Sequence, residues 1–148
     1  MTNAADQAVG MFSQRYNCAQ SVLACCGARF GLDRDLAVRL AAALGGGMGR
    51  GETCGAVSGA LLVLGLRFAS LDPQDAATKA KVYDLARQLQ KRFEQRNKFV
   101  RCSDLIGCDM ATPAGQQEAR DKGLLKSTCP KLVKDAAEIV EQILAECA

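Results

Sequence analysis

Apolar residues recur at helical spacing along almost the whole chain, and no segment shows the two-residue alternation that is typical of a half-buried strand. Helix-start signals divide this pattern, most clearly Asn17, Asp33 and the pair Asp72-Pro73. A chain of 148 residues is long enough to bury about 70% of its unfolded surface as one domain. We therefore expect an all-α fold, a single-domain helical bundle of about five to six helices over residues 1–148.

Cap residues and apolar periodicity together place the expected helices. The first helix is expected over residues 4–14, and the second is capped by Asn17, with Gln20 completing a capping box, and ends near Gly27 or Gly31. The third starts at Asp33 and has Leu36, Leu40 and Leu44 on one face, and the fourth is capped by Thr53 and runs from Cys54 to about Phe68. A long helix follows from Asp72-Pro73 to about Asn97, then a short turn around 103–106 and a last helix from Cys129-Pro130. Residues 109–123 are expected to form an irregular surface loop.

Four cysteines stand at or beside expected helix starts: Cys18, Cys54, Cys102 and Cys129. The start of a helix presents unpaired backbone N–H groups and the positive end of the helix dipole. Both favour the thiolate over the thiol, and the thiolate is the form that attacks disulfides and binds metals. Four such thiols in one small domain point to redox or metal chemistry rather than to packing.

The absence of histidine excludes several kinds of site. This chain supplies no Ser-His-Asp or Cys-His catalytic pair, no histidine ligand to zinc, and no histidine ligand or C-x-x-C-H attachment sequence for haem. A metal site must therefore rely mainly on sulfur, as iron–sulfur clusters and four-cysteine zinc sites do.

Charge and hydropathy argue against two other classes of partner. The net charge is +3, the 19 basic residues are scattered and only 5% of the residues are aromatic, so we expect no nucleic-acid binding. The most apolar stretch, residues 56–66, is too short to cross a bilayer, and residues 1–12 lack the pattern of a secretory leader. We therefore expect no membrane insertion and a cytoplasmic location, where structural disulfides are rare and eight cysteines point to metal binding or redox catalysis.

A glycine-rich segment, residues 45–53, leads into the helix start at Cys54. It lacks the Lys-Ser/Thr pair of a phosphate-binding P-loop and follows no strand, so we interpret it as backbone that wraps around Cys54 and donates N–H groups to sulfur. The residues expected to hold a cofactor here are Gly46, Gly47, Gly49, Gly51, Thr53 and Gly55. Glycine inside the following helix, at Gly55 and Gly59, costs about 1 kcal/mol per residue relative to alanine. Close helix packing, or space for a cofactor or second thiol beside Cys54, would offset this cost.

The run Cys54-Gly55-Ala56-Val57-Ser58-Gly59 resembles the central motif of the C_GCAxxG_C_C family of redox-active proteins. The resemblance covers roughly residues 10–144 and includes Asn17-Cys18-Ala19-Gln20-Ser21-Val22, Cys102 with Leu105 and Gly107, and Cys129-Pro130-Lys131-Leu132. It implies four signature cysteines, which are the same four that the helix starts select. The chain is also similar to the non-haem portion of split-Soret cytochromes, and that resemblance implies an iron–sulfur centre.

Three hypotheses follow, and the sequence leaves them open. The leading one is electron transfer or redox sensing through a [2Fe–2S]-type iron–sulfur cluster on Cys18, Cys54, Cys102 and Cys129. The main alternative is a thiol–disulfide oxidoreductase that uses the same cysteines without metal, with Cys18 or Cys54 as the nucleophile. The third is a structural zinc module with the same four ligands. Cys108 lies close to Cys102 in the sequence and could take its place.

The other cysteines are expected to have structural roles. Cys25 and Cys26 fall inside a helix, where one should face the core and the other its boundary. Cys147 is expected to be a bystander. The redox hypotheses require a redox partner protein, which the sequence does not identify, and they are compatible with a homodimer.

Overall fold

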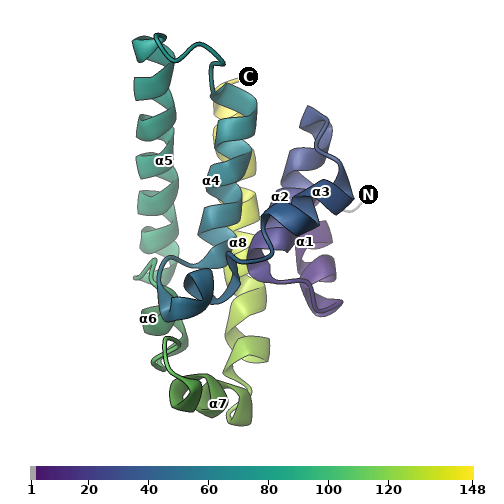
Figure 1. The fold of residues 1–148 in the computed structure, drawn as a ribbon, viewed down its shortest axis with the longest axis vertical. Coiled ribbons are helices and arrows are strands. Elements are labelled where there is room, and N and C mark those ends of the chain that lie inside the picture. Colours follow the sequence, from purple (N-terminus) through teal and green to yellow (C-terminus); the bar gives the residue numbers. More distant parts are fainter. Residues whose placement is uncertain (1–2) are drawn as a thin grey trace.

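The computed structural model describes residues 3–148, and this part of the chain is all-α, as predicted, without a named strand (Figure 1). It contains eight α-helices, more than the five to six expected. They are α1 (Ala4–Ser13), α2 (Cys18–Gly27), α3 (Arg34–Leu40), α4 (Gly55–Phe68), α5 (Ala76–Asn97), α6 (Cys102–Ile106), α7 (Pro113–Asp121) and α8 (Leu124–Glu146), with a 3-10 turn η1 (Ala28–Phe30) and a π-type turn η2 (Gly47–Gly51). No helix in residues 3–148 is long and apolar enough to span a membrane.

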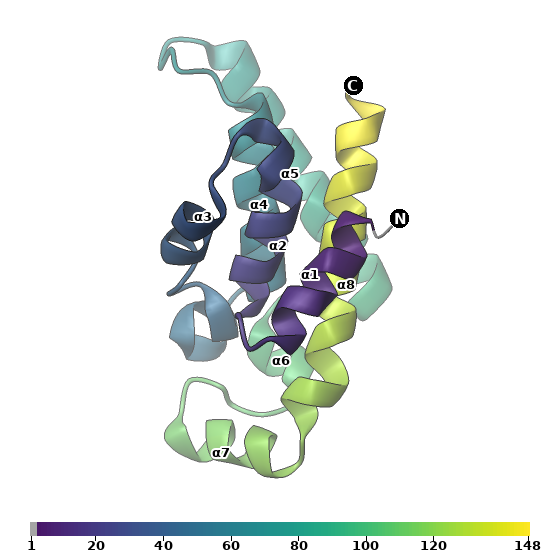
Figure 2. The ribbon, with the colours of Figure 1, turned by 90° about the vertical axis from the view of Figure 1, so that its right-hand side faces the viewer.

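The core lies between α2, α4, α5 and α8, with α1 packed across α2 and α8 (Figure 2). α2 and α4 approach each other closely at Gly59, where an added Cβ would lie 2.7 Å from the carbonyl oxygen of Ala19. Close helix packing is therefore one reason why α4 carries glycine. The core side chains are mostly alanines and branched aliphatics, together with Met11, Phe68, Phe93 and two cysteines, and they form one cluster.

The predicted capping box at the start of α2 is confirmed. The side-chain oxygen of Asn17 accepts from the backbone N–H of Gln20, and the Gln20 side chain accepts from the backbone N–H of Asn17, both at 2.8 Å. The amide of Asn17 also donates to the carbonyl oxygens of Ala41 and Ala42, at 3.3 Å and 3.1 Å. One side chain therefore starts α2 and also holds the segment that follows α3.

The prediction that Cys129 opens the last helix is wrong. α8 begins at Leu124, after Gly123 in the left-handed conformation, and both Cys129 and Pro130 lie inside it. A proline inside a helix lacks the N–H donor and crowds the preceding turn, at a cost of about 3 kcal/mol. Leu124 and Leu125 pack on a second small cluster around Cys102, and this burial offsets the cost of carrying the helix through Pro130.

Residues 109–123 were expected to be an irregular loop, but they contain α7. Thr112 accepts from the backbone N–H of Gly115 at 3.0 Å and Pro113 occupies the first turn, which is a standard helix start. The similar signal Asp72-Pro73 led to a wrong start for α5. This helix begins at Ala76, with Asp75 as its cap.

Two further expectations need correction. Thr53 does not cap α4: the cap position is Cys54 itself, without a side-chain cap bond. α3 ends at Leu40, so Leu44 is not part of the helix that was expected to continue to the glycines. Leu36 and Leu40 are 45% and 60% exposed. Only Ala37 of α3 is fully buried, because the helix meets the core with its narrow alanine side.

Candidate four-cysteine site

The four cysteines that the sequence selects line one cavity of about 200 Å³. Cys18 begins α2, Cys54 precedes α4, Cys102 begins α6, and Cys129 lies in the second turn of α8. These four elements meet below the middle of the molecule in Figure 1. The rest of the lining is mostly apolar and consists of Phe12, Asn17, Gly46, Gly55, Ile106, Met110, Leu125 and Leu132.

Two short backbone segments set the positions of Cys54 and Cys102. The backbone N–H of Cys54 donates to the carbonyl of Val100 at 2.8 Å, and that of Cys102 donates to the carbonyl of Glu52 at 2.6 Å. Between these bonds, Thr53 and Arg101 form an isolated antiparallel bridge. The end of the glycine segment is thus tied to the start of α6, so that both cysteines reach the cavity from adjacent backbones.

Gly55 leaves the space that the sulfur of Cys18 occupies. A Cβ atom added at Gly55 would overlap this sulfur and would lie 2.9 Å from the carbonyl oxygen of Leu44. The two explanations for glycine in α4 therefore both hold, at different positions. Gly59 permits helix contact, and Gly55 permits a second thiol beside Cys54.

Cys18 and Cys54 form a hydrogen-bonded pair of thiols. The Cys54 thiol donates to the Cys18 sulfur and, with the backbone N–H groups of Gly46 and Ala19, lowers the pKa of Cys18 to about 7 despite the opposing effect of burial. The same hydrogen bond and burial raise the pKa of Cys54 well above its usual value. Cys18 is therefore the thiol of the pair that ionises first, near neutral pH, while Cys54 keeps its proton.

The other two thiols of the cavity stay protonated at neutral pH. Burial, together with the negative charge of Cys18, raises the pKa of Cys102 to about 11. Burial and the charges of Cys18 and Cys102 raise the pKa of Cys129 to about 12. No charged side chain is among the described residues that line the cavity, so no cation is close enough there to favour further ionisation.

Three of the four cysteines lie at helix starts, two of these receive backbone N–H donors there, and only Cys18 has a lowered pKa. The sulfur of Cys18 accepts from N–H groups at the start of α2, and that of Cys54 accepts from the N–H groups of Ala56 and Val57 in the first turn of α4. Cys102 is the first residue of α6, but no backbone N–H group favours its thiolate, and burial raises its pKa. Cys129 lies beyond the first turn of α8 and gains no such donor, which is consistent with the high pKa of its thiol.

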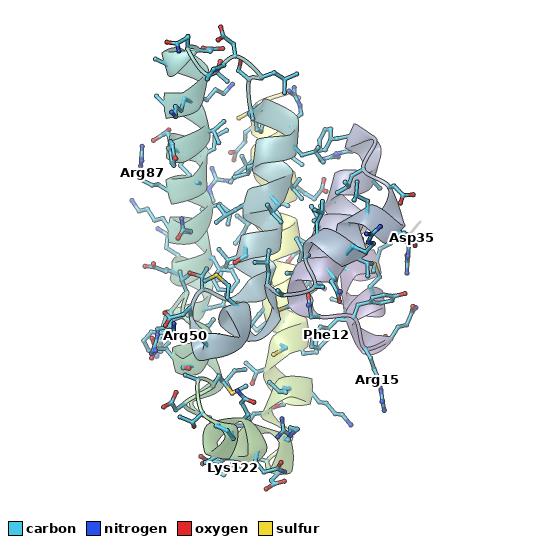
Figure 3. All side chains as sticks on the ribbon, viewed as in Figure 1. Phe12, Arg15, Asp35, Arg50, Arg87 and Lys122 are labelled. Atoms are coloured by element: carbon cyan, nitrogen blue, oxygen red, sulfur yellow. The ribbon has the colours of Figure 1, made fainter. Side chains whose placement is uncertain are left out.

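The glycine segment supports the site more than it lines it. Of the residues expected to hold a cofactor, Gly46 and Gly55 line the cavity, whereas Gly47, Gly49, Gly51 and Thr53 do not. Gly51 has a φ of +70°, and a Cβ atom there would collide with the hydroxyl of Ser103 in α6. That hydroxyl also accepts from the backbone N–H of Met110 at 3.0 Å. The segment therefore packs against α6 and holds Cys102, while Arg50 lies exposed on its outer side (Figure 3).

All eight cysteines are free thiols, and four lie outside the cavity. Cys108 is buried in the same small cluster as Cys102, but it lines a separate surface hollow with Phe99 and does not line the cavity. Cys26 is buried in the core, and Cys25 lies at its edge with its sulfur 3.4 Å from that of Met11. Cys147 is partly buried at the end of α8.

Sequence reasoning missed the apolar walls of the cavity. Phe12 reaches toward α8 from α1 (Figure 3), and Leu125 and Leu132 come from α8 on either side of Cys129. Helical spacing marked Phe12 and Leu132 only as inward-facing residues, because periodicity does not separate core packing from the lining of a site. Leu125 fell outside every expected helix. Among residues 3–148, no three Cys, Asp or Glu side chains converge on one point that could hold a single metal ion.

The fold and the cavity together define an all-α protein with a four-cysteine site. A family model described as "Putative redox-active protein (C_GCAxxG_C_C)" matches residues 16–143. The chain therefore belongs to this family of cysteine-containing redox-active proteins, and the resemblance seen in its sequence is confirmed. No curated protein and no solved structure matches the chain.

Proposed function

We propose that the cavity holds a [2Fe–2S] cluster on Cys18, Cys54, Cys102 and Cys129 and that the protein transfers single electrons or senses redox state. The observation that carries this proposal is the convergence of four thiols, from four separate elements, on one cavity with mostly apolar walls. A dithiol reaction needs only two of them. Four cysteines are the ordinary ligand set of such a cluster.

The residues present fit a cluster in donor type, space and electrostatics. The donors are all sulfur, and the cavity of about 200 Å³ lies between them. A [2Fe–2S] cluster takes two thiolates per iron, so it does not require three side chains to meet at one point. When bound, the cluster supplies one-electron exchange between its two iron oxidation levels.

The chain would offset the negative charge of the cluster site and surround it with apolar side chains. A site with four thiolates is negative, and the backbone N–H groups of Gly46, Ala19, Ala56 and Val57 that bond to sulfur oppose this charge. Cys54, Cys102 and Cys129 must each release a proton when they become ligands, so loading is favoured as pH rises. Phe12 and the leucines of α8 surround the sulfurs with apolar side chains, which limits the access of water.

A second function is supported by the hydrogen bond between Cys18 and Cys54. In this alternative the Cys18 thiolate attacks a partner's disulfide and forms a mixed disulfide, and one partner sulfur leaves as a thiolate. Cys54 then loses its proton and attacks the Cys18 sulfur, which releases the second partner thiolate. The partner gains two electrons, and the chain is left with a Cys18–Cys54 disulfide.

Metal analysis of protein purified without oxygen tests these proposals. The cluster proposal expects a coloured protein with about two iron and two sulfide ions per chain, and loss of both when any of the four cysteines is replaced by serine. Cys25→Ser and Cys147→Ser are the matched controls and should keep the iron. A metal-free protein with a reversible Cys18–Cys54 disulfide would support thiol exchange, and one zinc ion per chain would support a structural module.

A further inference from the structure

Four exposed leucines lie on α3 and α4, and none of them lines the four-cysteine cavity. Leu36 and Leu40 of α3 and Leu62 and Leu66 of α4 are 45%, 60%, 41% and 42% exposed, and we call these four residues the leucine face. Between the two helices runs a groove of about 430 Å³. Its lining is seven leucines and one glycine, which includes three members of the leucine face.

A continuous apolar surface of this kind is typical of a binding site. Single exposed leucines are common, but a groove lined almost entirely by leucine is not. The two pairs on α3 and α4 also follow the helix spacing i, i+4, so each helix presents a short apolar ridge.

Two charged residues, one of each sign, lie beside the leucine face. Asp35 and Arg39 are exposed one helical turn apart on α3, next to Leu36 and Leu40, and neither forms an ion pair with another residue of the described chain. Asp35 lies at the outer edge of the molecule in Figure 3. Arg34, the other basic residue of α3, instead stacks over Tyr16, 5.4 Å from the ring centre.

An antiparallel pairing of two α3 helices would cover the exposed leucines and also pair the charges of Asp35 and Arg39. A two-fold axis that passes the exposed side of α3, level with residues 37 and 38, would set Leu36 against Leu40 of the partner subunit and Asp35 against Arg39 of the partner subunit. The same two contacts then occur twice. Because the pair Asp35 and Arg39 has no net charge, this surface does not favour a strongly acidic or basic protein, whereas it complements itself.

We propose that the leucine face binds a second copy of this chain and forms a two-fold dimer through antiparallel α3 helices, with Leu62 and Leu66 flanking the contact. The proposal does not depend on the chemistry of the four-cysteine cavity, because none of the residues involved lines that cavity. Its test can therefore fail or succeed independently of the redox proposal.

Sedimentation equilibrium over a range of concentrations tests the proposal. The unmodified chain should dimerise, and Leu40→Lys should raise the dimer Kd by roughly tenfold or more, because it places a charge in the apolar contact. Leu71→Lys is the matched control: Leu71 is fully exposed in the turn before α5, and its replacement should leave the Kd unchanged. Far-UV circular dichroism verifies that each variant is folded.

A charge exchange tests the direction of the helices and does not alter the leucines. Asp35→Arg and Arg39→Asp should each raise the Kd by roughly tenfold, because each sets like charges against each other twice. The double variant D35R/R39D should restore the Kd to within about threefold of the original, since opposite charges face each other again. A monomer at all concentrations, a dimer insensitive to Leu40→Lys, or a double variant no better than the single ones would each overturn the proposal.

Discussion

At Gly55 the backbone of α4 passes directly beside the sulfur of Cys18. Any side chain there would displace either this sulfur or the carbonyl of Leu44. The pairing of Cys18 with Cys54 thus depends on the absence of a methyl group as much as on the two thiols. The family motif, in which glycine follows this cysteine, has a direct steric explanation in this chain.

Gly55→Ala should therefore lower stability and disturb the site together. Forcing a methyl group against Cys18 is expected to cost about 1–3 kcal/mol of unfolding free energy. Gly65→Ala is the control in the same helix, where an added Cβ meets nothing within 4 Å, and it should raise stability by up to about 1 kcal/mol. Urea unfolding gives both values, and equal effects of the two changes would contradict the steric explanation.

Cys18 should be the thiol that ionises first in the reduced, metal-free protein. Its pKa of about 7 is lowered from the ordinary value of 9.0, chiefly by the hydrogen bond from Cys54. The rate of its alkylation by iodoacetamide should rise with pH and reach half its maximum near pH 7. Peptide mass mapping separates its modification from that of Cys25 and Cys147.

The cause of this reactivity can be tested by removing the donor. In Cys54→Ala the half-maximum for Cys18 should move upward toward pH 9, since the main interaction that favours the thiolate is lost. Cys147→Ala should leave it unchanged. A half-maximum that stays near pH 7 in Cys54→Ala would assign the shift to the backbone N–H groups instead.

Among the elements, α5 and α8 are joined by a polar contact at one buried carboxylate. Asp135 of α8 accepts from Lys131 at 2.6 Å, from Asn97 at 3.1 Å and from Arg96 at 3.2 Å. Arg96 also bonds to Glu138 at 3.2 Å, at a more exposed position. The end of α5 leads directly to the segment that pairs with Glu52 and Cys54, so this contact helps to place α8 and Cys129 relative to the other thiols.

Asp135→Asn should weaken this contact by about 1–3 kcal/mol of unfolding free energy at neutral pH. Burial raises the pKa of Asp135, but the bonds from Lys131, Asn97 and Arg96 outweigh burial and keep it below the usual 3.8. A lowered carboxyl pKa stabilises the fold above the usual value, and this contribution is lost as pH falls through the lowered one. The difference between the variant and the unmodified protein should therefore shrink in strong acid.

Glu138→Gln is the matched control for Asp135→Asn. It removes a charge from the same Arg96, but the Glu138 side chain is 39% exposed whereas that of Asp135 is 10% exposed. Its expected cost is below about 1 kcal/mol. Chemical unfolding of both variants decides whether burial, rather than charge alone, sets the strength of the contact.

Local sequence signals predicted correctly the helix starts that depend on residues only a few positions away in the sequence. The capping box of Asn17 and Gln20 spans four residues and was correct. The start of α8 was missed because Leu124 and Leu125 bury themselves against α6 and α7, and no local pattern reports that contact. α7 was missed although Thr112-Pro113 gave a readable start signal.

At the scale of the whole molecule, the sequence identified the thiols but not how they come together. Helix starts and the family motif both selected the four cysteines that line the cavity. The bridge between Thr53 and Arg101, which brings two of them to adjacent backbones, involves a single residue on each side. A pairing this short has no periodicity, so the sequence contains no signal for it.

The gathered thiols also predict how the stability of the whole reduced, metal-free protein depends on pH. In the unfolded chain a thiol ionises near its ordinary pKa of 9.0, whereas folded Cys102 and Cys129 stay protonated until about pH 11 and 12. The unfolded state thus loses these protons first, and stability should fall as pH rises above 9. Each thiol accounts for about 1.4 kcal/mol per pH unit in this range.

Cys18 acts in the opposite direction at lower pH. Its folded pKa of about 7 is below its ordinary value, so its contribution is present above pH 9 and is lost as pH falls through 7. Urea unfolding at pH 8 and pH 10 tests the alkaline part of the prediction. Cys129→Ala should lose about 1.4 kcal/mol less between the two pH values than the unmodified protein does, because one buried thiol no longer ionises on unfolding. An equal loss in the two proteins would show that lysine and tyrosine residues, rather than the thiols of the cavity, set the alkaline limit.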